Sequence, residues 1–193
     1  MVINILRHGK PDLPSREKIG SSKMSEWINS YNSSSVIHEE RSCIQHFDGV
    51  SEEVFVVCSN LPRSIHSAEV IGYKNINVID RIFREAELPE LYIPLIKMKP
   101  HTWSMVFRVF WYFGVSLNVE SIKLFKLRVS SAAKALIKYS EEHEEILFIG
   151  HGIINRFIAK ELKSYGWQKD QVSSSNKHLG YEYWEYEKYN KGN

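Results

Sequence analysis

The chain of 193 residues has few cysteines and no long apolar run. Its two cysteines, Cys43 and Cys58, cannot form the disulfide framework that stabilises small secreted domains. The N-terminal segment MVINILRHGK has no basic leader followed by a long apolar stretch and a small-residue cleavage site. We therefore expect a cytoplasmic protein.

Neither a membrane nor a nucleic acid is expected as a partner. The most apolar window, residues 105–117, is shorter than the ~20 residues that cross a bilayer, and it contains Arg108. The 25 Lys and Arg residues nearly balance the 23 Asp and Glu residues. The pI of about 8.4 is below the strongly basic range of nucleic-acid-binding domains. The sequence carries no signal for an oligomeric state.

Short apolar runs with the length of β-strands alternate with helical patterns. Uninterrupted apolar runs are typical of strands that helices cover on both faces. The predicted helices span residues 62–71, 120–139 and about 154–162, each with an apolar stripe or a Pro in its first turn. This alternation predicts a three-layer α/β/α domain with a mostly parallel central sheet. The predicted strands are residues 2–6, 54–57, 76–79 and 146–149.

Two stretches do not fit the strand–helix alternation. Residues 10–48 are polar and rich in serine, and residues 88–118 carry three prolines and an aromatic cluster at 103–113. Insertions beyond strand ends commonly form a substrate cap. We expect one domain over residues 1–193, with a cap from these two insertions. The aromatic cluster either packs the cap against the sheet or lines a pocket or partner surface. Residues 181–186 alternate aromatic and acidic, which predicts a half-exposed edge strand.

Basic side chains follow three of the predicted strands. The first strand leads into Arg7 and His8, the second into a helix with Arg63 in its first turn, and the fourth into His151. The carboxyl ends of parallel strands meet at one edge of a sheet, so these side chains should converge there. Guanidinium groups and free N–H groups at helix N-termini bind phosphate well. The pattern therefore predicts a site for a phosphoryl group.

The motifs at these strand ends resemble those of the histidine phosphatase superfamily, also described as phosphoglycerate-mutase-like. The resemblance rests on four features in order along nearly the whole chain, of which each alone is weak. They are Leu6-Arg7-His8-Gly9, Ser59-Asn60-Leu61-Pro62-Arg63-Ser64 with Ser67-Ala68, an acidic residue after the third strand, and Phe148-Ile149-Gly150-His151-Gly152.

The resemblance implies phosphate monoester hydrolysis through a covalent phosphohistidine. In this interpretation His8 is the nucleophile, while Arg7, Arg63 and His151 stabilise the transferred phosphoryl group. Glu85 is the proton donor, with Glu87 in reserve. We expect no metal and no cofactor, because guanidinium groups supply the positive charge. Three further substrate-binding residues are expected: Gly9, Asn60 and Gly152.

Two other functions stay open at this stage. Mutases of the superfamily continue with Gly-x-Trp-Glu-Gly, where this chain has Leu88-Pro89-Glu90-Leu91, so a phosphatase is favoured over a mutase. The second alternative is a phosphate-recognition module without a working acid. A cysteine-dependent phosphatase is excluded, because only four residues separate Cys58 from Arg63. The substrate, a small phosphorylated compound or a phosphoprotein, is not identified by any cap motif.

Overall fold

The computed structural model describes residues 1–13, 17–37, 50, 53–170 and 185–192. Its centre is a six-stranded sheet in the order β4-β3-β6-β1-β8-β7. The pairs β1–β6, β3–β6 and β3–β4 are parallel, whereas β8 runs antiparallel to β1 and β7. The strands are β1 (Val2–Arg7), β3 (Phe55–Ser59), β4 (Val78–Asp80), β6 (Glu145–Gly150), β7 (Gln168–Lys169) and β8 (Tyr186–Asn190).

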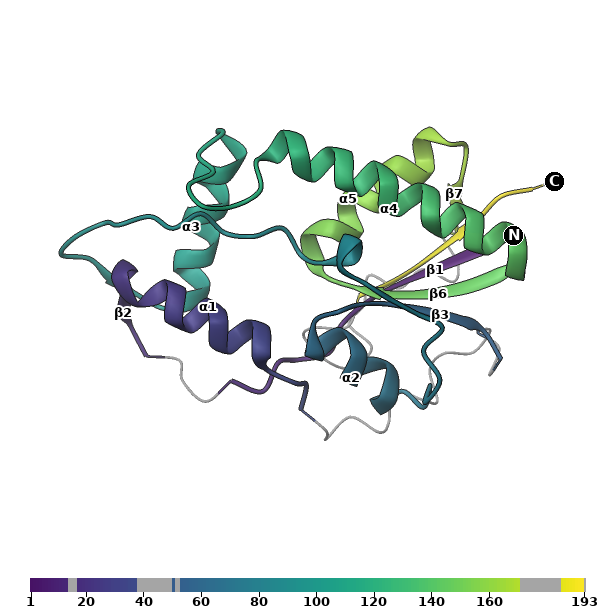
Figure 1. Ribbon diagram of the computed structural model, residues 1–193, viewed down its shortest axis with the longest axis horizontal. Helices are drawn as coiled ribbons and strands as arrows, with labels where there is room; N and C mark the ends of the chain where they lie inside the picture. Colours follow the sequence, from purple (N-terminus) through teal and green to yellow (C-terminus); the bar gives the residue numbers. More distant parts are fainter. Residues whose placement is uncertain (14–16, 38–49, 51–52, 171–184, 193) are drawn as a thin grey trace.

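Helices cover both faces of this sheet (Figure 1). Helix α2 (Pro62–Val70) lies on one face, and helices α4 (Ile122–His143) and α5 (Gly152–Ser164) lie on the other. Helix α4 begins where the Ser121 hydroxyl accepts a hydrogen bond from the Leu124 N–H. The predicted apolar stripe of α4 is buried from Phe125 to Leu136. The three-layer α/β class and its mostly parallel sheet are thereby confirmed.

The central strands are apolar on both faces because each face packs against a separate core. Ile3, Ile5 and Phe148 pack with α4 and α5 in the larger cluster. Leu6 and Ile149 point the other way and pack with α2 in a second cluster. Neighbouring residues of one strand thus serve opposite layers, which is why these strands show no polar alternation.

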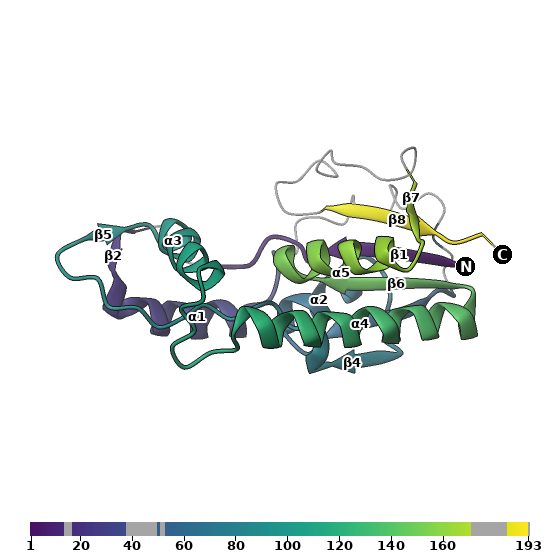
Figure 2. The same ribbon diagram turned by 90° about the horizontal axis from the view of Figure 1, so that it is seen from above.

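A smaller unit, here called the cap, lies beyond the carboxyl ends of the parallel strands (Figure 2). It contains α1 (Met24–Ser33), α3 (Pro100–Tyr112), the pair β2 (Ile19–Gly20) and β5 (Lys97–Met98), and the short 3₁₀ helix η1 (Ser21–Lys23). The two stretches expected as insertions supply all of these elements. A second 3₁₀ helix, η3 (Arg81–Phe83), follows β4 in the sheet domain.

The aromatic residues of α3 hold the cap together and attach it to the sheet domain. Trp103 and Phe107 are buried with Met24 in a core of the cap's own. The indole of Trp103 donates to the Ile19 carbonyl at 2.8 Å. Trp111, at the other end of α3, belongs to the main core. Both alternatives left open for residues 103–113 therefore occur: one face packs, while Met105, Val109 and Tyr112 line the cavity described below. None of the helices in the described ranges is both long and apolar enough to cross a membrane.

The edges of the sheet differ from the sequence expectation. Most of the expected strand 181–186 falls outside the described residues, and the described strand β8 starts at Tyr186. Strand β8 is not an edge, because β1 and β7 pair with its two sides. The third predicted strand is also displaced, since β4 starts at Val78 and leaves Ile79 half exposed at the opposite edge. An apolar run alone does not tell an edge strand from a central one.

We expect the protein to lose stability when Gly150, at the end of β6, is given a side chain. A Cβ atom there would meet the Asn155 Oδ1 atom and lie 2.5 Å from the Phe148 ring. We expect Gly150→Ala to lower the free energy of unfolding by about 1–3 kcal/mol, the range of overpacked sites. Urea denaturation followed by circular dichroism measures the change.

Gly20→Ala is the matched control, because a Cβ atom at Gly20 has only an ordinary contact with Ser22 at 3.7 Å. An equal loss of stability in the two variants would contradict the steric explanation.

Candidate active site

The three central strands end beside one another. The pairing register places Arg7 of β1 opposite Gly150 of β6, and Cys58 of β3 opposite Ile149. The residues after these ends, His8 and His151, have ring centroids 5.0 Å apart. The structure thus brings together the strand-end side chains that the sequence singles out.

His8 is buried and held by two hydrogen bonds. Its main-chain N–H donates to the Gly150 carbonyl at 3.0 Å. Its Nδ1 lies 2.7 Å from the Gly9 carbonyl oxygen, which can only accept, so Nδ1 carries the proton. The Nε2 atom of the neutral ring therefore has a free lone pair. Burial, and next the Arg63 guanidinium, lowers the pKa of His8 well below its usual value.

His151 is fully buried between Ser59 and His8. Its Nε2 lies 2.6 Å from the Ser59 hydroxyl, while Nδ1 has no hydrogen-bond partner among the described residues. Burial, followed by Arg63 and His8, lowers the pKa of His151 well below its usual value. A buried polar atom without a partner usually marks a place where a ligand or water binds.

Arg63 is a cation that is only 1% exposed. Its Nη1 donates to the Tyr31 carbonyl at 3.2 Å and to Asn32 Oδ1 at 3.3 Å, and its guanidinium lies 4.4 Å from the centre of the Tyr31 ring. Among the described residues, the Nε atom has no hydrogen-bond partner and no carboxylate forms a salt bridge with Arg63. Burial lowers the pKa of this guanidinium. A buried cation without a counter-charge is costly, which favours binding of an anion here.

Arg7 lies at the N-terminus of α5. Its Nη1 forms a salt bridge of 3.1 Å with Glu185, in which the side chains are 24% and 39% exposed. A Cβ atom at Gly152 would lie 3.5 Å from the Arg7 guanidinium carbon, so the absence of a side chain lets the guanidinium approach the helix.

Glu85 is fixed at the same helix N-terminus. Its Oε2 accepts from the Ile153 N–H at 2.9 Å, and its Oε1 accepts from Ala86 and Ile154 N–H groups at 3.0 Å each. A carboxylate accepts hydrogen bonds from the free N–H groups of a first helical turn, and its negative charge interacts favourably with the positive end of the helix dipole. Glu87, the reserve acid, is exposed and has no such anchor.

The backbone around Glu85 is held from two sides by arginines. Arg128 of α4 donates to the carbonyls of Ile82 and Arg84 at 2.7 and 2.8 Å. Arg108 of α3 donates to the carbonyls of Ala86 and Glu87 at 2.8 and 3.0 Å. The irregular segment that carries Glu85 is therefore attached both to the sheet domain and to the cap.

The other three predicted substrate-binding residues, Gly9, Asn60 and Gly152, lie in three different surroundings. Gly9 is buried, and both of its main-chain groups are used, because its N–H donates to Ser67 Oγ at 3.0 Å. Asn60 is exposed and does not line the adjoining cavity. Gly152 contacts Arg7, as described above. Of these three, Gly152 is the one placed against a guanidinium group, that of Arg7.

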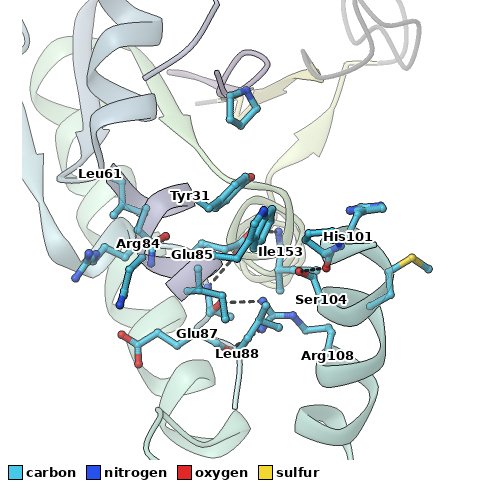
Figure 3. Close-up of a pocket in the computed structure, with 18 of the residues that line it drawn as sticks. Tyr31, Leu61, Arg84, Glu85, Glu87, Leu88, His101, Ser104, Arg108 and Ile153 are labelled. Atoms are coloured by element: carbon cyan, nitrogen blue, oxygen red, sulfur yellow. Dashed lines mark hydrogen bonds between the residues drawn. The ribbon is translucent and has the colours of Figure 1, made fainter. Parts of the chain in front are cut away.

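A cavity of about 930 Å³ opens between this edge of the sheet and the cap. Arg7, Arg63 and Glu85 line its inner end, and α1 and α3 form its outer walls. In Figure 3, Tyr31, Arg84 and Glu85 lie across the pocket from the α3 side chains His101 and Arg108.

Sequence reasoning missed several residues of this wall. Arg84 adjoins Glu85 in the acidic motif, so its position was a usable signal. Tyr31 and Asn32 reach Arg63 only through the packing of α1 on α2, which no local pattern reveals. Arg156 lies one turn along α5 from His151 and gave no signal either. Within the described ranges, no group of three or more His, Cys, Asp or Glu side chains is arranged to hold a metal ion.

The two buried histidines are expected to make stability depend on pH. Their folded-state pKa values lie below the unfolded value of about 6.5, so below that pH the unfolded chain binds protons that the folded chain does not. The free energy of unfolding should fall as pH decreases below about 6.5, by up to about 1.4 kcal/mol per pH unit for each histidine.

Urea unfolding at pH 7, 6 and 5 in phosphate-free buffer measures this slope. The variant with His8→Gln and His151→Gln should show a shallower slope, whatever its absolute stability. Equal slopes for the two proteins would rule out the buried histidines as the cause.

No family model matches the sequence, and no curated protein matches it significantly. Solved structures do match the fold. A putative alpha-ribazole-5'-P phosphatase from Escherichia coli is 17% identical, with a TM-score of 0.56 over 84% of this chain and 79% of that chain. A mycobacterial glucosyl-3-phosphoglycerate phosphatase is 16% identical, with a TM-score of 0.55 over 83% and 78% of the two chains.

A third match is the ecdysone phosphate phosphatase from Bombyx mori in complex with tungstate, 15% identical, with a TM-score of 0.53 over 85% of this chain and 78% of that chain. These structures are members of the histidine phosphatase superfamily. At such identities the match establishes the fold. The chain therefore has the fold of the histidine phosphatase superfamily, as its strand-end motifs predict.

Proposed function

We propose that residues 1–193 form one catalytic unit that hydrolyses phosphate monoesters through a phosphohistidine at His8. The observation that carries the proposal is the state of His8: a neutral ring with its proton on Nδ1 and a free lone pair on Nε2. Near it lies the buried Arg63, which forms no salt bridge with a described carboxylate. The shared fold and the phosphatase activities named for the similar structures support it.

The first step transfers the phosphoryl group to the enzyme. The His8 Nε2 lone pair forms a bond to phosphorus while the bond from phosphorus to the ester oxygen breaks. The departing alkoxide takes a proton from the Glu85 carboxyl group and leaves as an alcohol. The imidazole stays bonded to phosphorus through Nε2, and Nδ1–H donates a hydrogen bond to the Gly9 carbonyl throughout, which stabilises the cationic phosphohistidine.

The second step regenerates the enzyme. A water molecule attacks phosphorus opposite Nε2, and the ionised Glu85 takes its proton. The bond between phosphorus and Nε2 breaks, which returns its electron pair to the His8 ring. Inorganic phosphate leaves, and Glu85 is protonated for the next cycle. One ester and one water molecule thus give one alcohol and one phosphate.

Three side chains neutralise the charge on the phosphoryl oxygens. Arg63 offers its Nε–H, which has no partner among the described residues, and Arg7 lines the same cavity. If the Ser59 hydroxyl donates to Nε2 of His151, the Nδ1 atom of His151 carries a proton and becomes a third donor. Fixed donors in a buried site stabilise the transferred group without reorganisation, so the proposal includes no metal ion.

Glu85 suits the acid–base role better than Glu87 because its position is fixed. Its Oε1 already accepts two N–H groups, whereas Oε2 accepts one. Each carboxyl oxygen has two lone pairs, so Oε2 keeps one that can carry the transferred proton. Glu87 is exposed on the same cavity wall and has no such anchoring.

The nucleophile is tested with His8→Ala. We expect the wild type to hydrolyse phenyl phosphate in the presence of EDTA, and His8→Ala to lose at least about 1,000-fold in kcat/KM. When wild-type enzyme is mixed with ³²P-labelled substrate and then denatured, it should carry a phosphoryl label that acid removes and base does not.

Circular dichroism checks that His8→Ala is folded. Equal turnover by the two proteins would refute the mechanism, as would a phosphoenzyme that survives acid. Tight phosphate binding without any hydrolysis would instead indicate a recognition module. Isomerisation of added phosphoglycerate without release of phosphate would indicate a mutase.

The acid is tested by comparing Glu85→Gln with Glu87→Gln. We expect Glu85→Gln to lower kcat/KM for an alkyl phosphate by about 100-fold or more, because the poor leaving group needs a proton. With 4-nitrophenyl phosphate, whose leaving group needs little protonation, the loss should be much smaller. A larger loss in Glu87→Gln would reassign the proton donor to Glu87.

A further inference from the structure

The cavity is far larger than a phosphoryl group requires. Its volume of about 930 Å³ is at the upper end of the range for sites that enclose a drug-sized ligand. Arg7 and Arg63 line it at the edge of the sheet, whereas His8 and His151 are not among its lining residues. Helices α1 and α3 of the cap supply many of its other lining residues. The space beside these helices is therefore available to the part of the substrate that leaves.

The α1 wall is aromatic and begins at the phosphate-binding arginine. The Tyr31 ring lies against the Arg63 guanidinium, and the Trp27 ring stacks on Tyr31 with centroids 5.2 Å apart and an interplanar angle of 20°. Both aromatic residues line the cavity. Trp27 also packs against the cap core, which fixes the orientation of this wall.

The α3 wall presents a second apolar stripe. Met105, Val109 and Tyr112 occupy one face of the helix at spacings of four and three residues, and all three line the cavity. Their exposures are 60%, 54% and 46%. The opposite face of the same helix buries Trp103, Phe107 and Trp111, so Met105 and Val109 are additional to what packing the cap requires. The Tyr112 ring also stacks on Phe157.

Cations that also line the cavity favour a competing ligand, one with a second anionic group. Lys99 before α3 and Arg156 of α5 line it and are exposed, and Lys10, Arg84 and Arg108 line it and are half-buried. A long cationic side chain in water needs no ligand, since its charge is hydrated. A contiguous apolar stripe in a concave site does gain from being covered. The apolar walls therefore indicate the chemical class of the ligand more strongly than the exposed cations do.

We propose that the leaving group is a large, mainly apolar alcohol, of the class of polycyclic or extended aromatic alcohols, held between Trp27 and Tyr31 of α1 and the Met105–Val109–Tyr112 stripe of α3. This inference rests on the proposed phosphatase function. The phosphate group of the substrate lies at Arg63, and the apolar part of the alcohol fills the cavity under the cap.

A series of aryl phosphates tests the proposal, because their leaving groups differ in apolar area much more than in acidity. The wild type should show a kcat/KM for 4-biphenylyl phosphate about 10-fold or more above that for phenyl phosphate. Val109→Glu, and as a second variant Met105→Glu, should abolish most of this ratio. Phe113→Glu is the matched control: Phe113 follows α3 directly, is 85% exposed and does not line the cavity.

The outcomes separate this inference from the proposed function. Hydrolysis that depends on His8 but not on the size of the leaving group would overturn only the inference, as would a higher kcat/KM for 3-phosphoglycerate than for 4-biphenylyl phosphate. No His8-dependent hydrolysis of any ester would refute the phosphatase function. Calorimetry with phosphonates then tests the cavity alone: 4-biphenylylmethylphosphonate should bind more tightly than benzylphosphonate, and equal affinities would overturn the inference.

Discussion

The pairing of β6 with β1 on one side and β3 on the other is the constraint on which the site depends. Parallel pairing puts the carboxyl ends of all three strands at one edge, and the register aligns Arg7 with Gly150. Strands β1 and β6 are each followed at once by a histidine of the site, and β3 ends at Ser59, which contacts His151. Because the strands are buried on both faces, a register shift would expose apolar side chains in two layers, so core packing also fixes the positions of His8 and His151.

Arg63 links the cap to the site at the edge of the sheet. A buried guanidinium is costly without compensation, and its described partners, the Tyr31 carbonyl, Asn32 Oδ1 and the Tyr31 ring, all come from the end of α1. Carbonyl oxygens at a helix C-terminus carry partial negative charge, which suits a cation. They do not neutralise it, so the guanidinium stays positively charged and attracts an anion. The same contacts orient it toward His8, whose pKa it lowers.

The sequence predicted the parts of the molecule that local pattern determines. Apolar runs located the central strands, the stripe of α4 located its buried face, and the strand-end motifs located His8, Arg63 and His151. The edge strands were misplaced, because β4 and β8 depend on which neighbours pair with them. Tyr31 and Asn32 could not be found, since they reach Arg63 from 31 to 32 positions away through tertiary packing. The sequence also cannot show that the Nε atom of Arg63 is buried without a hydrogen-bond partner among the described residues.

The segment around Glu85 links the position of the carboxyl group to that of the cap. Arg128 comes from the sheet domain and is itself held by Glu120 in a salt bridge of 2.8 Å, whereas Arg108 comes from α3 and its guanidinium lies 5.0 Å from the Trp111 ring. The carbonyls these arginines hold lie on either side of Glu85. A shift of α3 that repositions its cavity wall would therefore also pull on the backbone at Ala86. The same helix carries Met105, Val109 and Tyr112, so under the proposed function the position of this cavity wall and the position of Glu85 are coupled through α3.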